Sequence, residues 1–404
     1  MKVLRIIKSV NPGGGGPIEG LLQQARQLAD DGIITEVVSL DDPAAPFVKT
    51  FPLTLYPLGR PVDRSGWRRF DPLRHYGYEP SLVPWLRAHQ DDYDVAVVEG
   101  LWNYSVMGAR RALVGSRLPY VVFSHGMLDP WFNKTYPVKT AFKQAMWFAC
   151  EGPLLSGAHA VLFTTEEEQV LARQSFRPYK VREKVVGFGT ADVPGDAAAQ
   201  IAAFRAAMPS LGDRPYLLYL SRIHPKKGCD LLIDAFAAIA KDYPGLDLVI
   251  AGPDRVGWQA DLEAQSARVG MSGRIHWPGM LMGDVKWGAF RDAEAFVLPS
   301  HQENFGVVVA EGMAAGKPVL ITDKVNIWRE VDASGGGLVE TDDVPGITRL
   351  LRRFLELSPA QKAEMGQRGR QAFLDRFEIG RAGIAIKAAL MDAASASRRT
   401  NRPS

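Results

Sequence analysis

The chain has 404 residues, of which 46% are hydrophobic and 23% charged, and it contains only two cysteines, Cys150 and Cys229. This length and apolar content predict two domains with cores of their own, and two distant cysteines exclude a disulfide scaffold or, by themselves, a zinc site. A net charge of +3 is too small to indicate nucleic-acid binding, and the sequence favours a cytoplasmic protein without a secretory signal or a membrane-spanning helix.

The first half of the chain alternates between predicted strands and helices. The predicted strands are residues 3–10, 35–40, 95–98, 120–123 and 158–163. A glycine loop at residues 11–17 leads into a helix at 18–30, whose apolar residues recur on one face. Residues 53–80 are rich in proline, arginine and aromatic residues, and they predict a long surface loop.

The second half repeats this alternation. Its predicted strands are residues 216–220, 247–251, 274–277, 295–298 and 318–321. Two successive β-α series predict an α/β fold with two mostly parallel sheets. We expect an N-terminal domain at 1–190, a linker at 191–213, a second domain at 214–379, a C-terminal helix at 380–395 that packs back on the first domain, and a disordered tail at 396–404.

Open α/β sheets bind ligands beyond the carboxyl ends of their strands, so polar loops at those ends are the candidate sites. The first such loop contains four consecutive glycines, Gly13 to Gly16, which let backbone N–H groups approach a phosphate at a helix N-terminus. The dinucleotide pattern G-x-G-x-x-G is not met, because Ile18 takes its last position. A tight turn that only packs the helix on the sheet is the alternative.

The second loop follows residues 120–123 and holds His125 beside Gly126. A histidine at a strand end is placed for hydrogen bonding or acid–base chemistry, although many histidines are purely structural. The third loop carries Arg222 and Lys227 on either side of a turn. An arginine fork and a lysine charge can converge on a diphosphate there, and a solvated basic turn is the alternative.

The fourth loop starts after residues 295–298 and runs through Glu303 to Gly306, with Glu311 in the helix that follows. Gly306 near the helix start exposes N–H donors toward a phosphate, which the helix dipole also favours. Glu311 interrupts an apolar run, and an unpaired buried carboxylate is costly. We therefore expect a polyhydroxyl or basic partner for Glu311, with a core salt bridge as the alternative.

Together, the motifs S-R-I-H-P-K-K-G and E-N-F-G-V-V-V-A-E-G-M-A-A-G-K-P-V are similar to those of retaining glycosyltransferases of family 4. The segment H-G-M-L-D-P-W, which begins at His125, resembles enzymes of bacterial exopolysaccharide or lipopolysaccharide assembly. The resemblance is strongest over residues 214–330. It implies the GT-B architecture, in which two Rossmann-like domains face an interdomain cleft. It also implies a nucleotide-diphosphate sugar as donor, UDP- or GDP-linked, with no cofactor and no metal ion.

The resemblance further implies residue roles in the second domain. Arg222 and Lys227 would hold the donor diphosphate, Glu303 would bind hydroxyls of the transferred sugar, and Glu311 would bind the nucleotide ribose. The backbone of Asn304, Phe305 and Gly306 would contact sugar and phosphate.

In the first domain, the resemblance implies that His125 touches the donor sugar near the reacting carbon. Gly14 and Gly15 would approach the diphosphate or the acceptor. The acceptor is expected to be a saccharide or a lipid-linked saccharide bound by this domain, which carries the whole net charge of +3.

Basic and aromatic residues are interleaved in two segments of the first domain, at 57–80 and 127–147. They include Arg60, Arg64, Trp67, Arg68, Arg69, Phe70, Arg74, Tyr76 and Tyr78, and then Trp131, Phe132, Lys134, Lys139, Phe142, Lys143 and Trp147. This composition fits a surface that meets anionic lipid headgroups at the inner face of a cell membrane, or the diphosphate of a lipid-linked acceptor. Ordinary loops and a helix packed on the core are the alternative.

Three other functions remain open. A nucleotide-sugar epimerase would turn over donor without acceptor, and a glycogen-synthase-like polymerase would extend its product processively. A non-catalytic scaffold would bind a nucleotide sugar without transferring it. The joint presence of Arg222, Lys227, Glu303 and Glu311 argues against the scaffold, because binding alone does not require all four.

Overall fold

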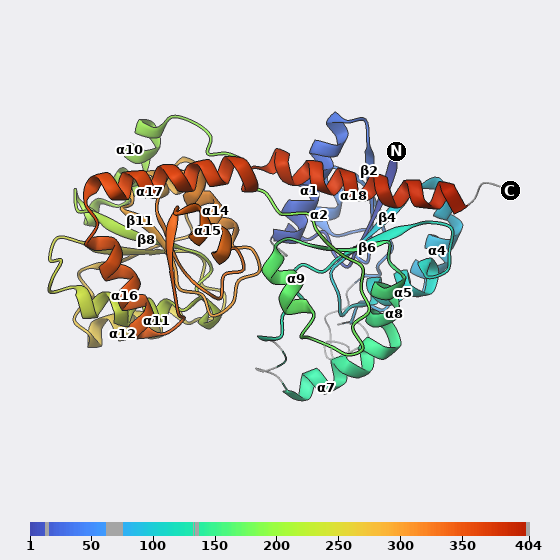
Figure 1. The fold of residues 1–404 in the computed structure, drawn as a ribbon, viewed down its shortest axis with the longest axis horizontal. Helices are drawn as coiled ribbons and strands as arrows, with labels where there is room; N and C mark the ends of the chain where they lie inside the picture. The colour runs from blue at the N-terminus through green and yellow to red at the C-terminus, as the bar shows by residue number, and fades with distance from the viewer. Residues whose placement is uncertain (13–15, 62–75, 132, 134–136, 401–404) are drawn as a thin grey trace. The chain divides into compact units, whose positions relative to one another are not determined.

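A computed structural model describes the chain except for residues 13–15, 62–75, 132, 134–136 and 401–404 (Figure 1). The chain forms two compact units. Unit 1 contains Met1–Phe188 and Ala382–Ser404, and unit 2 contains Gly189–Arg381. The expected linker at 191–213 differs from this arrangement, because the segment contains helix α10 (Ala197–Ala207) and lies within unit 2. Its alanine-rich composition suits a helix as well as a linker.

Unit 1 is built on a seven-stranded sheet. Its strands are β1 (Lys2–Ile7), β2 (Ile34–Ser39), β3 (Thr54–Pro57), β4 (Val95–Glu99), β5 (Tyr120–Phe123), β6 (Ala160–Phe163) and β7 (Glu183–Val185). They are arranged in the order β3-β2-β1-β4-β5-β6-β7, and every adjacent pair is parallel. The predicted α/β class with a parallel sheet is therefore confirmed for this half.

Helices cover both faces of this sheet. They are α1 (Gly16–Asp30), α2 (Pro46–Lys49), α4 (Leu82–Ala88), α5 (Tyr104–Leu113), α7 (Pro137–Met146), α8 (Gly152–Gly157), α9 (Glu166–Ala172) and α18 (Ile379–Thr400). Alternate strand residues point to opposite faces. Val3 packs in one cluster with Leu390 of α18, whereas its neighbour Leu4 packs in another with Leu86 of α4.

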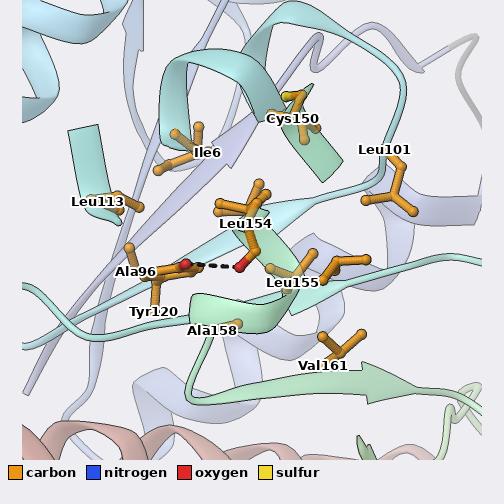
Figure 2. Packing of buried hydrophobic residues seen from close by; sticks show 14 of the residues in the cluster. Ile6, Ala96, Leu101, Leu113, Tyr120, Cys150, Leu154, Leu155, Ala158 and Val161 are labelled. Atoms are coloured by element: carbon orange, nitrogen blue, oxygen red, sulfur yellow. Dashed lines mark hydrogen bonds between the residues drawn. The ribbon is translucent and has the colours of Figure 1, made fainter. Parts of the chain in front are cut away.

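The cluster on the α4 and α5 side is closed by α8 and by a short π-helix at Trp147–Glu151 (Figure 2). The Tyr120 hydroxyl, buried in this cluster, donates a 2.8 Å hydrogen bond to the Leu154 carbonyl oxygen. Cys150 is fully buried here, and burial raises the pKa of its thiol to about 12. Cys150 is therefore part of the core rather than a reactive group.

Unit 2 repeats the plan with a six-stranded parallel sheet in the order β10-β9-β8-β11-β12-β13. Its strands are β8 (Tyr216–Leu220), β9 (Asp247–Ala251), β10 (Ile275–Gly279), β11 (Ala295–Leu298), β12 (Val319–Thr322) and β13 (Gly337–Glu340). Besides α10, its helices are α11 (Cys229–Ile239), α12 (Gln259–Arg268), α13 (Gly283–Asp292), α14 (Val307–Ala314), α15 (Trp328–Ser334), α16 (Val344–Leu355) and α17 (Pro359–Ala372). The second predicted parallel sheet is also confirmed.

Two details differ from the sequence expectations. The loop expected at 53–80 begins with the edge strand β3, and residues 62–75 of that loop lie outside the described residues. The helix α18 continues to Thr400, into the expected tail at 396–404, of which 401–404 are not described. No helix in the described part of the chain is both long and apolar enough to span a bilayer.

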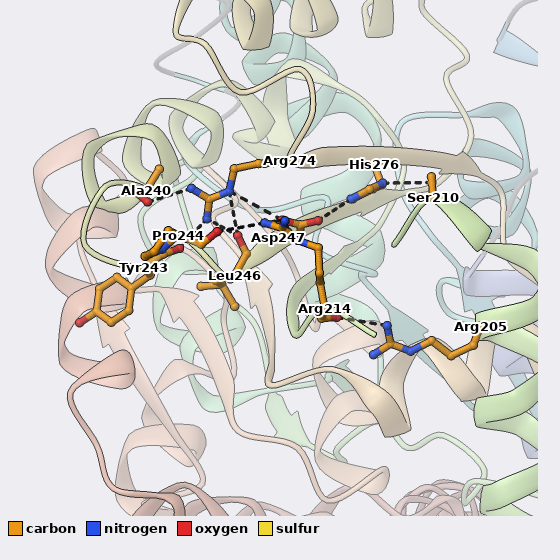
Figure 3. Close-up of polar contacts among 10 residues, drawn as sticks. All are labelled: Arg205, Ser210, Arg214, Ala240, Tyr243, Pro244, Leu246, Asp247, Arg274 and His276. Carbon is orange, nitrogen blue, oxygen red and sulfur yellow. Dashed lines mark hydrogen bonds and ion pairs between the residues drawn. The ribbon is translucent and has the colours of Figure 1, made fainter. Parts of the chain in front are cut away.

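A charged cluster closes the amino edge of the second sheet (Figure 3). Asp247, the first residue of β9, is 1% exposed and accepts hydrogen bonds from Arg214 and from His276. Arg274 donates to the carbonyl oxygens of Ala240, Tyr243 and Leu246. These groups satisfy one another at the edge opposite to the carboxyl ends of the strands, so this cluster stabilises the fold rather than binding a ligand there.

Candidate active site

In unit 2, the loops that follow β8 and β11 bring a cation and a carboxylate into direct contact. Lys227 in the first loop forms an ion pair with Glu303 in the second. The Lys227 residue is only 5% exposed, whereas the Glu303 side chain keeps 21% of its surface accessible. The ammonium group of the pair is therefore largely buried, while its carboxylate is partly exposed. An exposed carboxylate held in this way suits contact with a polar ligand.

Backbone contacts explain why these two loops meet. Gly228 has a positive φ of 67°, and a Cβ atom at this position would clash with the Pro299 carbonyl oxygen. Only glycine allows this close approach. The His301 N–H donates a 2.9 Å hydrogen bond to the Lys226 carbonyl oxygen, and the Glu303 N–H donates one of 2.9 Å to the Lys324 carbonyl oxygen. The positions of Lys227 and Glu303 are thus set by the main chain.

The turn after β8 is also a region of positive charge. Burial lowers the pKa of His224, and the nearby charges of Arg222, Lys226 and Lys227 lower it further. The neutral ring can then accept the 3.1 Å hydrogen bond from the Lys226 N–H at Nδ1 and cap the short helical turn Pro225–Lys227. Arg222 is exposed on this turn, while Lys227 is buried beneath it.

The segment Asn304–Phe305–Gly306 leads from Glu303 into α14. Phe305 is 5% exposed and packs edge-on against Phe377, with ring centroids 5.6 Å apart. Gly306 is the N-cap of α14 and has a positive φ of 76°. An anchored aromatic ring and a left-handed glycine place the first N–H groups of the helix directly after the Glu303 loop, where they can face an anion.

Glu311 lies inside α14, and it forms an ion pair that is separate from the Lys227–Glu303 pair. Its Oε1 atom accepts a 2.7 Å hydrogen bond from the Nζ atom of Lys286 in α13, and its side chain is 9% exposed. The expected basic partner is therefore present. Lys286 was not identified from the sequence, because a single lysine in an amphipathic helix carries no recognisable signal.

In unit 1, His125 follows β5 with a positive φ of 48°, which is uncommon for a residue other than glycine. Its Nε2 atom donates a 2.7 Å hydrogen bond to Oε2 of Glu99, and its ring stacks on Phe123. Glu99 also pairs with the buried Arg5 at 2.5 Å, and Arg5 donates to Gln24 at 2.9 Å. His125 thus ends a buried hydrogen-bonded chain that runs from Gln24 through Arg5 and Glu99.

Burial alone would raise the pKa of Glu99, but the Arg5 charge and the hydrogen bond from His125 outweigh it and hold the pKa below its usual range. Glu99 is therefore ionised and can only accept hydrogen bonds, so Nε2 of His125 must carry the hydrogen. The other ring nitrogen, Nδ1, is then an acceptor when the ring is neutral. The Glu99 carboxylate therefore fixes the tautomer of His125 and leaves Nδ1 as the nitrogen that could contact a ligand.

A second buried carboxylate holds the backbone on either side of His125. Glu168 in α9 accepts hydrogen bonds from the Ser124 hydroxyl at 2.6 Å and from the Gly126 N–H at 2.7 Å. Its other oxygen accepts from the N–H and the hydroxyl of Thr164. Arg5, Glu99 and Glu168 were not predicted from the sequence. Of these, Glu99 was detectable, because it is the last residue of a buried strand.

Gly14 and Gly15 lie outside the described residues, so their role stays a prediction. Cys229 is buried at the start of α11, and burial raises the pKa of its thiol to about 12, which makes it unreactive. The described residues hold no group of three or more His, Cys, Asp or Glu side chains arranged for a metal ion.

The expected basic-aromatic surface is present only in part. Phe142 on α7 is 70% exposed, and Val138, one turn before it, is 85% exposed. Phe148 in the π-helix is 62% exposed. We call Val138, Lys139, Phe142 and Phe148 the α7 surface.

Other residues expected on this surface are placed elsewhere. Trp147 was wrongly expected to belong to it. It is 1% exposed and donates from Nε1 to the Pro178 carbonyl oxygen, because its bulk fills the core. Arg60 forms an ion pair with Glu79. Of the expected aromatic and arginine residues, the following lie outside the described part: Arg64, Trp67, Arg68, Arg69, Phe70, Arg74 and Phe132. Lys134 also lies outside it.

Comparison with protein families divides the chain as the fold does. Residues 15–189 match the model "Glycosyl transferase 4-like domain", and residues 200–372 match "Glycosyl transferases group 1". The first match falls in unit 1 and the second in unit 2. Both candidate clusters, Glu99–His125 and Lys227–Glu303, lie within matched regions.

Individual proteins are also similar to this chain. A GDP-mannose:cellobiosyl-diphosphopolyprenol alpha-mannosyltransferase of Xanthomonas oryzae is 26% identical, and the match covers 85% of this chain and 84% of the relative. A D-inositol 3-phosphate glycosyltransferase of Streptomyces avermitilis is 32% identical over 41% of this chain, and the match spans only 37% of that relative. The crystal structure of HepE from Anabaena in complex with UDP has a TM-score of 0.74 at 18% identity, and the match covers 97% of this chain and 100% of that chain.

Proposed function

The chain belongs to the family 4 glycosyltransferases of GT-B architecture, and on this premise we propose that it transfers a glycosyl unit from a nucleoside-diphosphate sugar to an acceptor hydroxyl, with retention at the anomeric carbon and without a metal ion. The observation that carries the proposal is the Lys227–Glu303 pair beside the N-terminus of α14. It provides a cation for a diphosphate and a carboxylate for sugar hydroxyls at one edge of the sheet.

The donor diphosphate would be held by positive charge supplied by the protein. Lys227 is fixed under the turn after β8, Arg222 is exposed on it, and Gly306 opens the N-terminus of α14. As the bond between the anomeric carbon and the phosphate oxygen breaks, negative charge develops on the leaving diphosphate. Fixed cations and helix N–H groups stabilise that charge without reorganising, which is the main way such sites lower a barrier.

The transferred sugar would be oriented by Glu303, whose carboxylate accepts hydrogen bonds from sugar hydroxyls. The acceptor oxygen would attack the anomeric carbon from the face that the diphosphate leaves, and the departing phosphate oxygen would take the acceptor proton. The new bond then has the configuration of the old one. This path needs no protein nucleophile, so it differs from the two-carboxylate scheme of retaining glycosidases.

His125 would contact the donor sugar near the reacting carbon. Its strained backbone, held by Glu168, and its tautomer, fixed by Glu99, support a positioning or polar-contact role rather than a purely structural one. Backbone strain of this kind persists only where surrounding contacts impose it.

The donor would be linked to UDP or to GDP. The HepE structure contains UDP, while the Xanthomonas relative is named for GDP-mannose. Thermal unfolding of the protein with a panel of UDP- and GDP-linked sugars tests donor binding directly, because a ligand that binds only the folded state raises the unfolding temperature. The proposal predicts a selective rise for one nucleotide class, and a protein that no nucleotide sugar stabilises would contradict it.

Glu311 would bind the nucleotide ribose through its second carboxylate oxygen while Lys286 holds the first. We expect Glu311→Gln to weaken binding of the nucleoside diphosphate by about tenfold, which corresponds to the loss of one charge-assisted hydrogen bond. Calorimetric titration with the nucleoside diphosphate measures this change. As a control, Lys286→Gln breaks the same ion pair without removing the carboxylate, and it should weaken binding less than Glu311→Gln. Equal losses in the two variants would show that only the ion pair matters.

The acceptor would be a lipid-linked saccharide at the inner membrane face, in bacterial surface-polysaccharide synthesis, and the α7 surface would meet the lipid. The name of the Xanthomonas relative specifies a diphosphopolyprenol acceptor. In this chain, residues 130–150 contain three lysines and no acidic residue. Exposed apolar side chains next to lysines favour an anionic bilayer surface.

Phe142→Ser should reduce binding to vesicles of phosphatidylcholine with 30% phosphatidylglycerol. Burying one phenylalanine side chain is worth about 2 kcal/mol, so the expected loss is about thirtyfold. Co-sedimentation measures the bound fraction. The matched control is Ile384→Ser on α18, because Ile384 is 66% exposed but lies outside the α7 surface. Equal binding by both variants and the unmodified protein would rule out the α7 surface as the lipid contact.

A further inference from the structure

A pocket of about 450 Å³ lies within unit 2, at the amino edge of its sheet. It is lined by residues from the ends of α13 and α14, from α17 and from the start of α10, including Arg291, Lys317, Arg370, Asp192, Ile201 and Ala314. Lys317 lies two residues before β12, whereas Glu303 follows β11 at the other edge. The pocket is therefore separate from the candidate donor site.

The charges that line this pocket are unbalanced. Among the described lining residues, Asp192 is the single acidic one. Arg370 pairs with it, and this pair, together with the nearby charge of Arg291, lowers the pKa of the Asp192 carboxyl. Among the described residues, Arg291 donates only to the carbonyl oxygens of Pro194 and Gly195, at 3.4 and 3.5 Å, and its buried Nε atom has no hydrogen-bond partner there. These contacts are too long to satisfy a guanidinium group.

Lys317 is the second cation of this pocket that forms no ion pair with a described residue. Burial lowers the pKa of its ammonium group, and the charges of Asp292 and Glu294 offset this only in part. Those two carboxylates are already engaged, with Arg205 and Lys362 respectively. Within the described part of the chain, Lys317 has no carboxylate at ion-pair distance. A partly desolvated ammonium without a counterion is costly, so its presence calls for an anionic partner.

We propose that this pocket binds a small phosphate monoester between Arg291 and Lys317. The guanidinium group can donate two parallel hydrogen bonds to phosphate oxygens, and the ammonium group supplies a point charge. Val193, Ile201 and Ala314 give the pocket an apolar wall for the carbon part of the ligand. Its occupant is an effector rather than a substrate, because the candidate catalytic groups of unit 2 lie at the opposite edge. The proposal does not depend on the transferase activity.

The test measures the unfolding temperature of the full chain during titration with inorganic phosphate and with glycerol 3-phosphate, against sodium chloride of equal ionic strength. We expect both anions to stabilise the protein, glycerol 3-phosphate at lower concentration. Lys317→Met and Arg291→Gln should each raise the apparent Kd at least about tenfold, as expected for loss of a charge-assisted contact. Lys317→Met should also raise the unfolding temperature without ligand, since it removes an uncompensated cation.

Two controls distinguish this pocket from a phosphate site elsewhere on the protein. Lys241→Met removes the same charge from an exposed position of unit 2 and should leave the phosphate response unchanged. Lys227→Met changes the candidate donor site and should also leave it unchanged. A response that disappears in Lys227→Met would assign phosphate to the donor site and overturn the proposal. A response that Lys317→Met and Arg291→Gln retain, or no response in the unmodified protein, would overturn it as well.

Discussion

Replacing Lys227 with methionine should lower kcat/KM for sugar transfer by about a hundredfold or more. A well-placed charge that stabilises a leaving group lowers the activation free energy by about 3 kcal/mol. Lys227 is buried under the turn, so we expect no neighbouring side chain to take its place. The matched control is Lys226→Met, which removes the same charge from the same turn without touching Glu303. It should reduce kcat/KM by less than about fivefold, as expected for a surface charge.

The ion pair makes the double variant informative. Lys227→Met leaves Glu303 without its cation, and Glu303→Gln leaves Lys227 without its anion, so either change can disturb the loops as well as the chemistry. Lys227→Met/Glu303→Gln removes both charges. We expect it to be about as inactive as each single variant, because groups that act as a unit are not additive. Activity recovered in the double variant would show that the pair is only structural.

Replacing Glu99 with glutamine should have the largest effect on stability. The change leaves the guanidinium of Arg5, which is 1% exposed, buried without an anion. Breaking a buried ion pair in this way costs about 3–5 kcal/mol, measurable as a lower urea midpoint for unit 1. Activity should fall too, because His125 loses the carboxylate that fixes its tautomer.

A second substitution separates these two effects of Glu99. Arg5→Met/Glu99→Gln removes both buried charges and should recover most of the stability, since replacing a buried pair by neutral groups is often nearly neutral. His125 still lacks its carboxylate in this variant, so kcat should stay low. A double variant that regains both stability and activity would contradict a positioning role for Glu99.

The sequence was sufficient for the architecture and for the residues that stand directly after strands. Buried strands with β-branched runs, such as Val95–Val98, are recognisable from their composition, and the loops after such strands contain Lys227, Glu303 and His125. The sequence did not reveal ion pairs between residues that lie far apart along the chain. Arg5 and Glu99 are 94 residues apart, and Lys286 and Glu311 are 25 apart. Such pairs depend on how strands are ordered and helices packed, which local patterns do not encode.

Two wrong expectations have the same physical origin. Trp147 lies among lysines and aromatic residues in the sequence, which suggest a surface. It is instead the first residue of the π-helix, and its side chain is buried in the core of unit 1. Residues 197–207 are alanine-rich and suggest a linker, but they form α10, which packs on α13. There, Gly288 permits the close approach, because a Cβ atom would clash with the Gln200 carbonyl oxygen. The composition of a segment alone does not show which of its side chains pack against the rest of the protein.

Release of nucleoside diphosphate from the donor tests directly whether the protein transfers sugar with the help of Lys227. The unmodified protein, Lys226→Met and Lys227→Met would be incubated with each nucleotide sugar of the panel, with and without a polyprenyl-diphosphate-linked saccharide. We predict release from one donor class by the unmodified protein and Lys226→Met, faster with acceptor, and about a hundredfold slower release by folded Lys227→Met. Equal release by Lys227→Met, or no release from any donor by the unmodified protein, would contradict the account.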